Sequence, residues 1–392
     1  MVDITARTRL KLLAGFAATL LPGCGSSGGS LPASIPVPVP VPPPPPPAPT
    51  PPVSGLLRGT YAPNFLIGAA IGALQIQTGS DDANILANQF SSITAENAMK
   101  PQAIAPTEGN YNFSEADALL TFAEANNIQL RGHTLLWHQQ TPDYFFAGTR
   151  ADIRARLEKY ITDVVTHFKG KVYAWDVVNE VTSDGDGGTA PYRDNNWYQA
   201  VGPEYIDWAF QAARAADPDV KLFINDYNTE SPDKQARFLQ IIEDLLARNI
   251  PLDGVGHQAH VSTTVNPDDI LGAIDAVDNL FAGLENHITE LDISVYTDPG
   301  SCYGSPPTNC AADYGANIPD SVLRTQAQLY RDIFNGLVAR PSVTSATFWG
   351  LTDDQTWLNT FPISRTNYPL LFDANREPKP AFHAITDPTF VI

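Results

Sequence analysis

Two glutamates stand at predicted strand ends, and they define the chemistry to consider first. Residues 172–178 are mostly β-branched or aromatic, which predicts a buried strand, and Asn179 and Glu180 follow it directly. Glu290 and Asp292 alternate within another apolar run, so both side chains are predicted to face the same side. Two carboxyl groups on nearby strands can cleave a glycosidic bond, one as proton donor and the other as nucleophile. Polar residues at a single strand end need no function. The residues at the other strand ends therefore decide whether these glutamates belong to a functional site.

The ends of the other predicted strands carry the same kinds of side chain. Carboxylates and amides hydrogen-bond hydroxyl groups, indole rings stack on flat sugar faces, and burying such groups costs free energy unless they pair. A single histidine or tryptophan there is more often a core residue than a ligand, but the set together predicts a carbohydrate site. Its members are Glu96, Asn97, Lys100, His133, Trp137, Gln140, Asn225, Tyr227, Gln258, His260, Trp349 and Trp357.

The sequence makes two further predictions about residues at these strand ends. Gln258 and His260 alternate with Ala259, so both are predicted to point to one side of one strand. Asp353 and Asp354 follow the last strand and are predicted to be solvated loop acids.

Eight short apolar runs, separated by amphipathic stretches, must position these residues. This alternation predicts a (β/α)8 barrel, the TIM barrel of the α/β class, whose active site lies at the carboxyl ends of the strands. A doubly wound open sheet is the alternative, but no glycine-rich dinucleotide loop follows the first run. The runs are 65–71, 91–94, 129–135, 172–178, 221–224, 254–258, 287–293 and 345–349.

Composition and motifs exclude several other functions. The formal net charge of −19 argues against a nucleic-acid partner, which requires a basic face. No His-Glu-x-x-His sequence or cysteine pair accompanies the histidines, so no metal site is predicted, and no cofactor is expected. A Gly-x-Ser-x-Gly turn of serine hydrolases is also absent from the sequence.

The first 54 residues are predicted to precede the folded domain. Residues 1–23 have basic residues followed by an apolar run too short to span a bilayer, which is typical of a signal peptide. The signal ends at Leu21-Pro22-Gly23-Cys24, which resembles a bacterial lipoprotein processing box, so Cys24 is expected to be lipidated. Pro22 fits that pattern poorly, so secretion with a free Cys24 is the alternative.

A linker then leads to one domain. Residues 24–54 are rich in glycine and serine and then in proline, which predicts an extended spacer without a fold of its own. Residues 55–392 form the predicted catalytic domain. The expected location is extracytoplasmic, either secreted or anchored at the cell surface, with membrane contact only through a lipid on Cys24.

Seven motifs, in order, make the domain resemble glycoside hydrolase family 10, the retaining endo-β-1,4-xylanases. The resemblance covers about Tyr61 to Phe382 and is carried by residues 96–100, 131–138, 175–180, 225–228, 256–260, 288–292 and 347–350, with residues 369–373 in support. It implies hydrolysis of β-1,4-xylosidic bonds in xylan. A β-1,4-glucanase of a related barrel family and a non-catalytic xylan-binding lipoprotein are the alternatives, although a binder needs neither Glu180 nor Glu290.

The resemblance implies a role for each catalytic residue. Glu180 is the expected general acid and then base, and Glu290 the nucleophile, with their carboxyl groups about 5–5.5 Å apart and their pKa values pushed in opposite directions. His260 is expected to hydrogen-bond Glu290, with Asp292 orienting His260. Asn179 is expected to bind the sugar 2-hydroxyl group.

The remaining residues are implied to bind the sugar chain. Glu96, Asn97 and Lys100 are expected on the non-reducing side, and His133, Trp137 and Gln140 at the cleavage subsite. Trp349 and Trp357 are expected as its roof, Tyr227 on the leaving-group side and Gln258 beside the carboxylates, with Asn225 as a further substrate-binding residue. Pro101, Tyr144, Phe145 and Leu358 depart from the family pattern, which leaves the preference for chain length and branches open. The expected partners are xylan and xylo-oligosaccharides, and the expected state is a monomer.

The long polar loop at residues 297–319 contains Cys302 and Cys310. In an oxidising compartment these two are expected to form a disulfide, which would stabilise the loop by restricting its unfolded state. Two free thiols are the alternative.

Overall fold

The computed structural model describes residues 56–185 and 190–392. The predicted signal peptide, Cys24 and the linker lie outside these residues. Within them, no helix is both long and apolar enough to cross a membrane.

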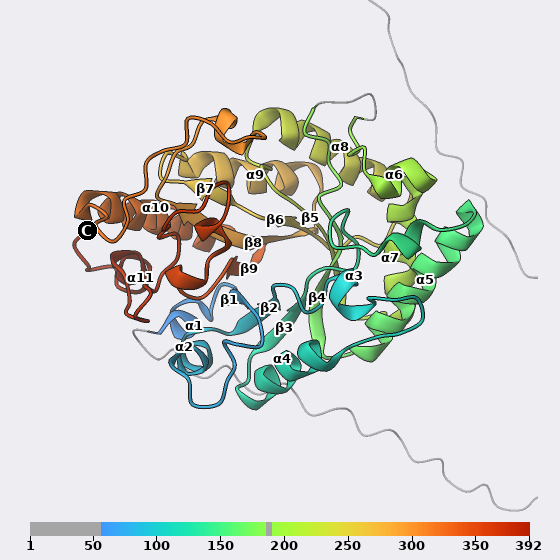
Figure 1. Cartoon of the computed structure of the whole chain (residues 1–392), viewed down its shortest axis with the longest axis horizontal. Helices are drawn as coiled ribbons and strands as arrows, with labels where there is room; N and C mark the ends of the chain where they lie inside the picture. Colours follow the sequence, from blue (N-terminus) through green and yellow to red (C-terminus); the bar gives the residue numbers. More distant parts are fainter. Residues whose placement is uncertain (1–55, 186–189) are drawn as a thin grey trace, which may run out of the picture. The chain divides into compact units, whose positions relative to one another are not determined.

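A closed parallel sheet forms the centre of the domain (Figure 1). Consecutive strands pair in parallel, β6 pairs with β8, and β9 returns to pair with β1, which closes a barrel of eight strands. This confirms the predicted (β/α)8 barrel. The strands are β1 (Leu66–Ile71), β2 (Ser92–Ala95), β3 (Gln129–Gly132), β4 (Val172–Asn179), β5 (Lys221–Asp226), β6 (Gly254–His257), β8 (Glu285–Ser294) and β9 (Val343–Phe348).

A ninth strand, β7 (His260–Ser262), was not predicted. It pairs only with the far end of β8, with His260 opposite Asp292. The sixth run is therefore broken, because Ala259 takes a left-handed conformation with φ of +60° between β6 and β7. The expectation that Gln258 and His260 alternate along one strand is wrong.

Helices surround the barrel and follow its strands in sequence (Figure 1). They begin with local signals, for example Asn266, whose side chain accepts a bond from the Asp268 N–H at the start of α9. The α-helices are α1 (Leu57–Tyr61), α2 (Asp81–Gln89), α3 (Pro101–Ile104), α4 (Ser114–Ala125), α5 (Arg150–His167), α6 (Asn196–Val201), α7 (Glu204–Ala216), α8 (Pro232–Ala247), α9 (Pro267–Leu280), α10 (Asp320–Val338) and α11 (Pro380–Thr386). Short 3-10 helices are η1 (Asp143–Phe146), η2 (Gly300–Tyr303), η3 (Asp353–Gln355) and η4 (Trp357–Asn359).

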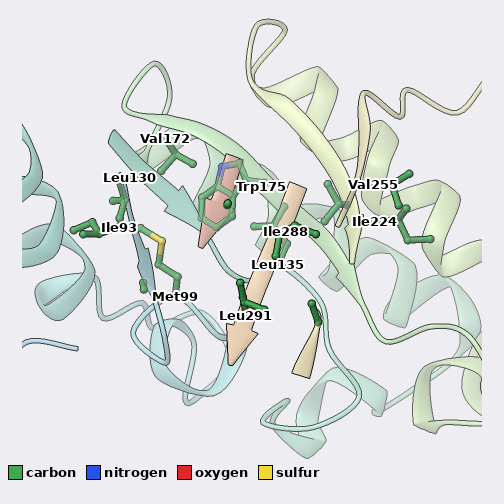
Figure 2. Packing of buried hydrophobic residues seen from close by; sticks show 14 of the residues in the cluster. Ile93, Met99, Leu130, Leu135, Val172, Trp175, Ile224, Val255, Ile288 and Leu291 are labelled. Atoms are coloured by element: carbon green, nitrogen blue, oxygen red, sulfur yellow. The ribbon is translucent and has the colours of Figure 1, made fainter. Parts of the chain in front are cut away.

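The apolar core includes a layer between sheet and helices. Phe348 of β9, for example, contacts the rings of Tyr330 and Phe334 on α10 at centroid distances of 5.8 and 5.7 Å. Figure 2 shows part of this core around β4 and β8. Trp175 of β4 packs so closely on β3 that a Cβ at Gly132 would lie 2.1 Å from its ring, so this position requires glycine.

The barrel interior contains a buried ion pair. Arg131 of β3 is 1% exposed and forms a forked pair with the fully buried Asp176 of β4, one bond measuring 2.7 Å. The same guanidinium contacts Phe223 of β5 and His287 of β8, so it crosses the interior. Burial alone would raise the pKa of Asp176, but Arg131 and His133 lower it to about 2.

A disulfide joins Cys302 and Cys310, with their Cα atoms 4.9 Å apart. Asp298 lies beside them, and these three residues are the one group of possible metal ligands within the described part of the chain. Metals bind cysteine as a thiolate, and both sulfur atoms are already joined in the disulfide.

We expect Arg131→Met to lower the free energy of unfolding by about 3–5 kcal/mol, because it leaves the Asp176 carboxylate buried without its cation. Urea unfolding at pH 7 measures this. Arg324→Met is the control, since Arg324 pairs with Asp320 on the exposed surface of α10, and its loss should cost less than about 1 kcal/mol. Equal effects of the two variants would contradict the assigned importance of the interior pair.

Candidate active site

Glu180 directly follows β4 and is held in an unusual backbone conformation. Its φ of +57° lies in the left-handed region, which costs a non-glycine residue about 1–2 kcal/mol. Its N–H donates to the Asn225 carbonyl at 2.8 Å, and its own carbonyl accepts from Arg193 Nε at 2.8 Å. The neighbouring residues therefore fix both sides of this residue, which is only 9% exposed.

Glu290 lies on β8 and is 4% exposed. Each oxygen of its carboxyl group has a separate partner. Asn225 Nδ2 donates to Oε1 at 2.7 Å, and His260 Nε2 lies 3.1 Å from Oε2. Thr289 Oγ1 donates to Asn225 Oδ1 at 2.7 Å, which orients the amide so that its N–H groups face the carboxylate.

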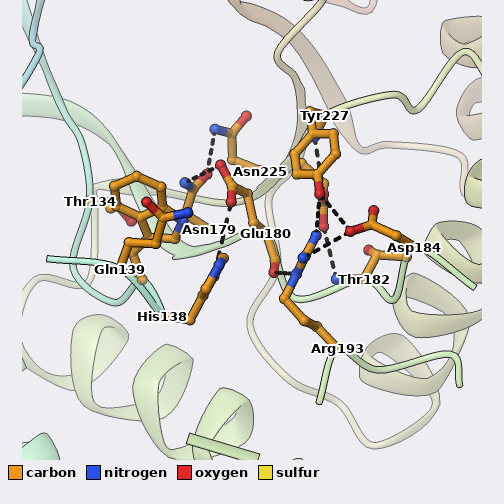
Figure 3. A network of polar contacts seen from close by, with 12 residues as sticks. Thr134, His138, Gln139, Asn179, Glu180, Thr182, Asp184, Arg193, Asn225 and Tyr227 are labelled. Carbon is orange, nitrogen blue, oxygen red and sulfur yellow. Dashed lines mark hydrogen bonds and ion pairs between the residues drawn. The ribbon is translucent and has the colours of Figure 1, made fainter. Parts of the chain in front are cut away.

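Amide side chains connect the two glutamates, and Figure 3 shows the part of this chain that includes Asn225, Asn179 and Glu180. Asn225 Nδ2 also donates to Asn179 Oδ1 at 2.8 Å, and Asn179 Nδ2 donates to Glu180 Oε1 at 3.3 Å. Gln258 Nε2 donates to the same Glu180 oxygen at 3.2 Å. Glu180 and Glu290 are thus the two ends of one hydrogen-bonded chain through residues of β4 and β5.

His260 lies between two carboxylates. Its Nδ1 is 2.9 Å from Asp292 Oδ2, and its Nε2 contacts Glu290. Trp357 Nε1 donates to the same Asp292 oxygen at 2.8 Å. Burial alone would lower the pKa of His260, but Asp292 and Glu290 raise it to about 10. His260 is therefore a cation near neutral pH and donates to both acids. The break at Ala259 brings His260 to Glu290, because β7 pairs with the end of β8.

The two glutamates have opposite acidities. Burial raises the pKa of Glu180, and the charges of Asp226 and Glu290 raise it further. Trp137 and Gln258 lower this pKa but do not cancel the increase. Burial would also raise the pKa of Glu290, but the hydrogen bond and charge of His260, with His133, lower it below the ordinary value. One carboxyl group is therefore biased toward its protonated form and the other toward its ionised form.

The predicted residues after β2 lie next to this pair. Lys100 is 6% exposed, and its Nζ donates to Asn97 Oδ1 at 2.9 Å and lies 4.9 Å from the ring centre of Trp137. Burial lowers the pKa of Lys100, whereas the charges of Glu290, Glu96 and Glu180 oppose that change. Burial likewise raises the pKa of Glu96, whereas the charge of Lys100 opposes that change.

His133 and Trp349 pack against each other beside His260. His133 is 2% exposed, and its Nδ1 lies 2.9 Å from Asp176 Oδ2, so the interior ion pair also supports this histidine. Trp349, which follows β9, is edge-on to His133 and His260 at centroid distances of 5.1 and 6.2 Å.

Two predicted site residues lie outside the hydrogen-bonded chain of the glutamates, and one further prediction is wrong. The hydroxyl group of Tyr227 contacts Asp184 and Arg193, and its predicted stacking on a sugar stays a prediction. Gln140 is exposed, and its main-chain carbonyl accepts a hydrogen bond from the Gln102 N–H at 2.8 Å. Asp353 is not a solvated loop acid: it is 3% exposed and pairs with Lys379 at 2.8 Å. The basic partner lies 26 positions later in the chain, which the local sequence does not indicate.

Several contributors were missed by sequence reasoning. Asp176 and Arg131 were hidden inside apolar runs, although a charge in a buried strand signals an unseen partner. Thr289 precedes Glu290, and its hydroxyl orients the bridging amide. His138 Nδ1 lies 4.0 Å from Glu180 Oε2, and burial, with Arg193, lowers its pKa to about 4, so it is neutral at pH 7.

Comparison with known proteins decides the family. The sequence profile of glycosyl hydrolase family 10 matches residues 57–388.

This chain belongs to glycosyl hydrolase family 10.

Individual relatives agree with the family. The chain is 42% identical over 345 residues to a thermostable celloxylanase of Thermoclostridium stercorarium, covering 83% of this chain and 85% of that protein. It spans 27–31% of the length of three larger relatives. The crystal structure of xylanase B from Clostridium stercorarium F9 superposes with a TM-score of 0.79 at 41% identity, covering 85% and 99% of the two chains. A mutant structure in complex with xylotriose has a TM-score of 0.77 at 36% identity, covering 85% and 99%. The family predicted from the motifs is confirmed.

We expect His260→Asn to raise the pKa of Glu290 by at least about one pH unit, because the cation that opposes burial is lost. The sign follows from the folded protein: the bound imidazolium favours the carboxylate, so its removal moves ionisation of Glu290 to higher pH. Carbon-13 NMR titration of glutamate carboxyl groups, with Glu290→Gln to assign the signal, measures the change. His383→Asn on α11 is the control, and an unchanged Glu290 titration in His260→Asn would refute the role of the cation.

Proposed function

We propose that this family 10 protein is an endo-1,4-β-xylanase that hydrolyses xylan and xylo-oligosaccharides with retention of configuration, acting as a monomer. The observation that carries the proposal is the opposite acidity of Glu180 and Glu290 at the ends of one hydrogen-bonded chain. A retaining glycosidase needs one protonated and one ionised carboxyl group at the scissile bond. Family membership supports the same reaction.

In the first step Glu290 attacks the anomeric carbon and Glu180 gives its proton to the departing oxygen. The bond to the leaving sugar breaks as the ester bond to Glu290 forms, so the leaving sugar departs with a hydroxyl group. His260 holds one Glu290 oxygen and Asn225 the other, which keeps the carboxylate in place for attack.

In the second step the Glu180 carboxylate removes a proton from water, and that water displaces Glu290. The exchange of roles follows from the charges. The ionised Glu290 raises the pKa of Glu180, and this charge disappears once Glu290 is esterified. Glu180 therefore becomes more acidic in the intermediate, when it must act as a base.

The neighbouring residues supply sugar contacts in this proposal. Asn179 binds the 2-hydroxyl group, and Glu96, Asn97 and Lys100 hold the sugars on the non-reducing side. His133, Trp137 and Gln140 line the cleavage subsite. Trp349 and Trp357 cover the cleaved xylose, and Tyr227 stacks on the leaving-group side. Trp357 is fixed by Asp292 on its N–H and by Phe361, whose ring stacks on it at 5.0 Å. A fixed indole leaves little freedom to admit the extra hydroxymethyl group of glucose.

Replacing either glutamate tests the proposal. We expect Glu290→Ala to reduce sugar release from glucuronoxylan and arabinoxylan by at least about 10⁴-fold while xylan binding remains. Glu180→Ala should lose about 10²–10⁴-fold, and azide should partly restore the activity on activated aryl xylobiosides, giving the β-xylobiosyl azide.

The same assays test the alternatives. Carboxymethylcellulose distinguishes a glucanase, which would hydrolyse it as fast as xylan. A folded wild-type protein that binds xylan but releases no sugar would instead be a non-catalytic binder. Either result contradicts the proposal.

We further propose that the enzyme is exported and anchored through a lipid on Cys24, with residues 24–54 as the spacer. The support is the sequence around Leu21–Cys24 and the proline-rich segment after it. In a bacterial host, we expect wild-type protein to incorporate labelled palmitate and to sediment with membranes. Cys24→Ser should do neither, whereas Ser26→Ala should behave as wild type. Unlabelled wild-type protein in the medium would contradict anchoring.

A further inference from the structure

Arg193 makes a three-way contact beside the proposed proton donor (Figure 3). Its Nε donates to the Glu180 carbonyl at 2.8 Å, and its Nη2 donates to the Tyr227 hydroxyl at 2.6 Å. Its Nη1 lies 2.9 Å from Asp184 Oδ2. The side chain is 17% exposed. One planar group thus connects the chain after β4, the tyrosine after β5 and an acid of the intervening loop.

The main chain of Arg193 is also fixed. Its N–H donates to the Val181 carbonyl at 2.7 Å, and its carbonyl accepts from the Asn195 N–H at 3.0 Å. Thr182 and Tyr192 form an antiparallel bridge next to it. The guanidinium therefore extends from an anchored backbone, which is what a group needs if it is to hold another residue in place.

A second cation completes the network without adding net charge. Lys234 Nζ contacts Asp184 Oδ1 at 2.6 Å and Asp226 Oδ1 at 3.1 Å. It also lies 3.8 Å from the centre of the Tyr227 ring, over one face of that ring. Two cations face two carboxylates here, so the arrangement fixes geometry rather than supplying a field of one sign.

Glu180 needs such support. Its left-handed backbone is unfavourable for a glutamate, and a small rotation there would displace the carboxyl group at the end of the side chain. Two hydrogen bonds to the Glu180 main chain oppose that rotation: its N–H donates to the Asn225 carbonyl, and its carbonyl accepts from the Arg193 side chain.

We propose that Arg193 is a positioning residue that aligns the Glu180 carboxyl group with the leaving-group oxygen. It does so by fixing the Glu180 main chain and the Tyr227 ring relative to each other, so that a sugar stacked on Tyr227 presents its oxygen to the acid. The inference rests on the proposed glycosidase function. Arginine suits the task because its donors have a fixed planar arrangement, whereas lysine offers one flexible ammonium group.

Proton donation can be isolated by varying the leaving group alone. Aryl xylobiosides ranging from dinitrophenyl to phenyl have aglycones of similar size but different need for a proton, since dinitrophenolate leaves without one and phenolate does not. The value of kcat/KM reports the steps up to bond cleavage, where Glu180 acts as acid. A misaligned acid should therefore make the rate depend more steeply on the leaving group.

For Arg193→Gln we expect kcat/KM to fall by about 10–100-fold on the phenyl glycoside and by less than about 3-fold on the dinitrophenyl glycoside. Arg193→Lys, which keeps the charge and is the more conservative change for folding, should show the same trend. Arg340→Gln is the matched control, because Arg340 likewise pairs with an acid, Asp275, through two bonds of 2.7 Å, and is similarly buried. Its leaving-group dependence should equal that of the wild type.

An equal loss on all aryl xylobiosides would overturn the inference, because it would reflect general damage to the fold. A full return of the wild-type dependence in Arg193→Lys would also overturn it, since charge alone would then suffice. Failure of the wild type to cleave any xylobioside is a different result, which would refute the glycosidase function itself.

Discussion

The constraint on which the site depends is that two buried carboxyl groups must differ in protonation. Burial raises the pKa of both Glu180 and Glu290, so burial alone cannot distinguish them. The protonated His260 makes the difference, because it contacts only Glu290 of the pair. Its charge persists because Asp292 holds its other nitrogen, and Trp357 holds Asp292. Glu180 faces amides and the neutral His138 instead.

The barrel supplies this asymmetry through its strand ends. Parallel pairing brings the ends of β4, β5 and β8 together, but ideal strands would not aim every side chain correctly. Glu180 and Ala259 both adopt left-handed backbones where β4 and β6 end. These local costs, of order 1–3 kcal/mol each, are tolerated because the surrounding sheet determines the conformation. Deeper in the barrel, Asp176 pairs with Arg131 and also fixes His133, so the interior charge connects the core to the site.

The sequence predicted what depends on periodicity. Alternating apolar and amphipathic runs gave the barrel, and the rule that ligands gather at carboxyl ends of strands placed Glu180, Asn225 and Glu290 together. Prediction from the sequence failed where contacts are long-range or the backbone is irregular. Gln258 and His260 both reach the glutamates, but through a break at Ala259 rather than by alternation. The Arg131–Asp176 pair joins residues 45 positions apart, and no local pattern indicates such a partner.

The two sides of the proposed reaction centre solve different problems. Glu290 must be ionised before attack, so a charged partner that always favours the carboxylate is useful there. Glu180 must change its charge twice in each cycle, and a fixed cation on its carboxyl group would oppose reprotonation. The structure instead places Arg193 on the main-chain carbonyl of Glu180 and balances it with Asp184, while Lys234 balances Asp226. Charge thus sets the state of the nucleophile, whereas backbone geometry sets the aim of the acid.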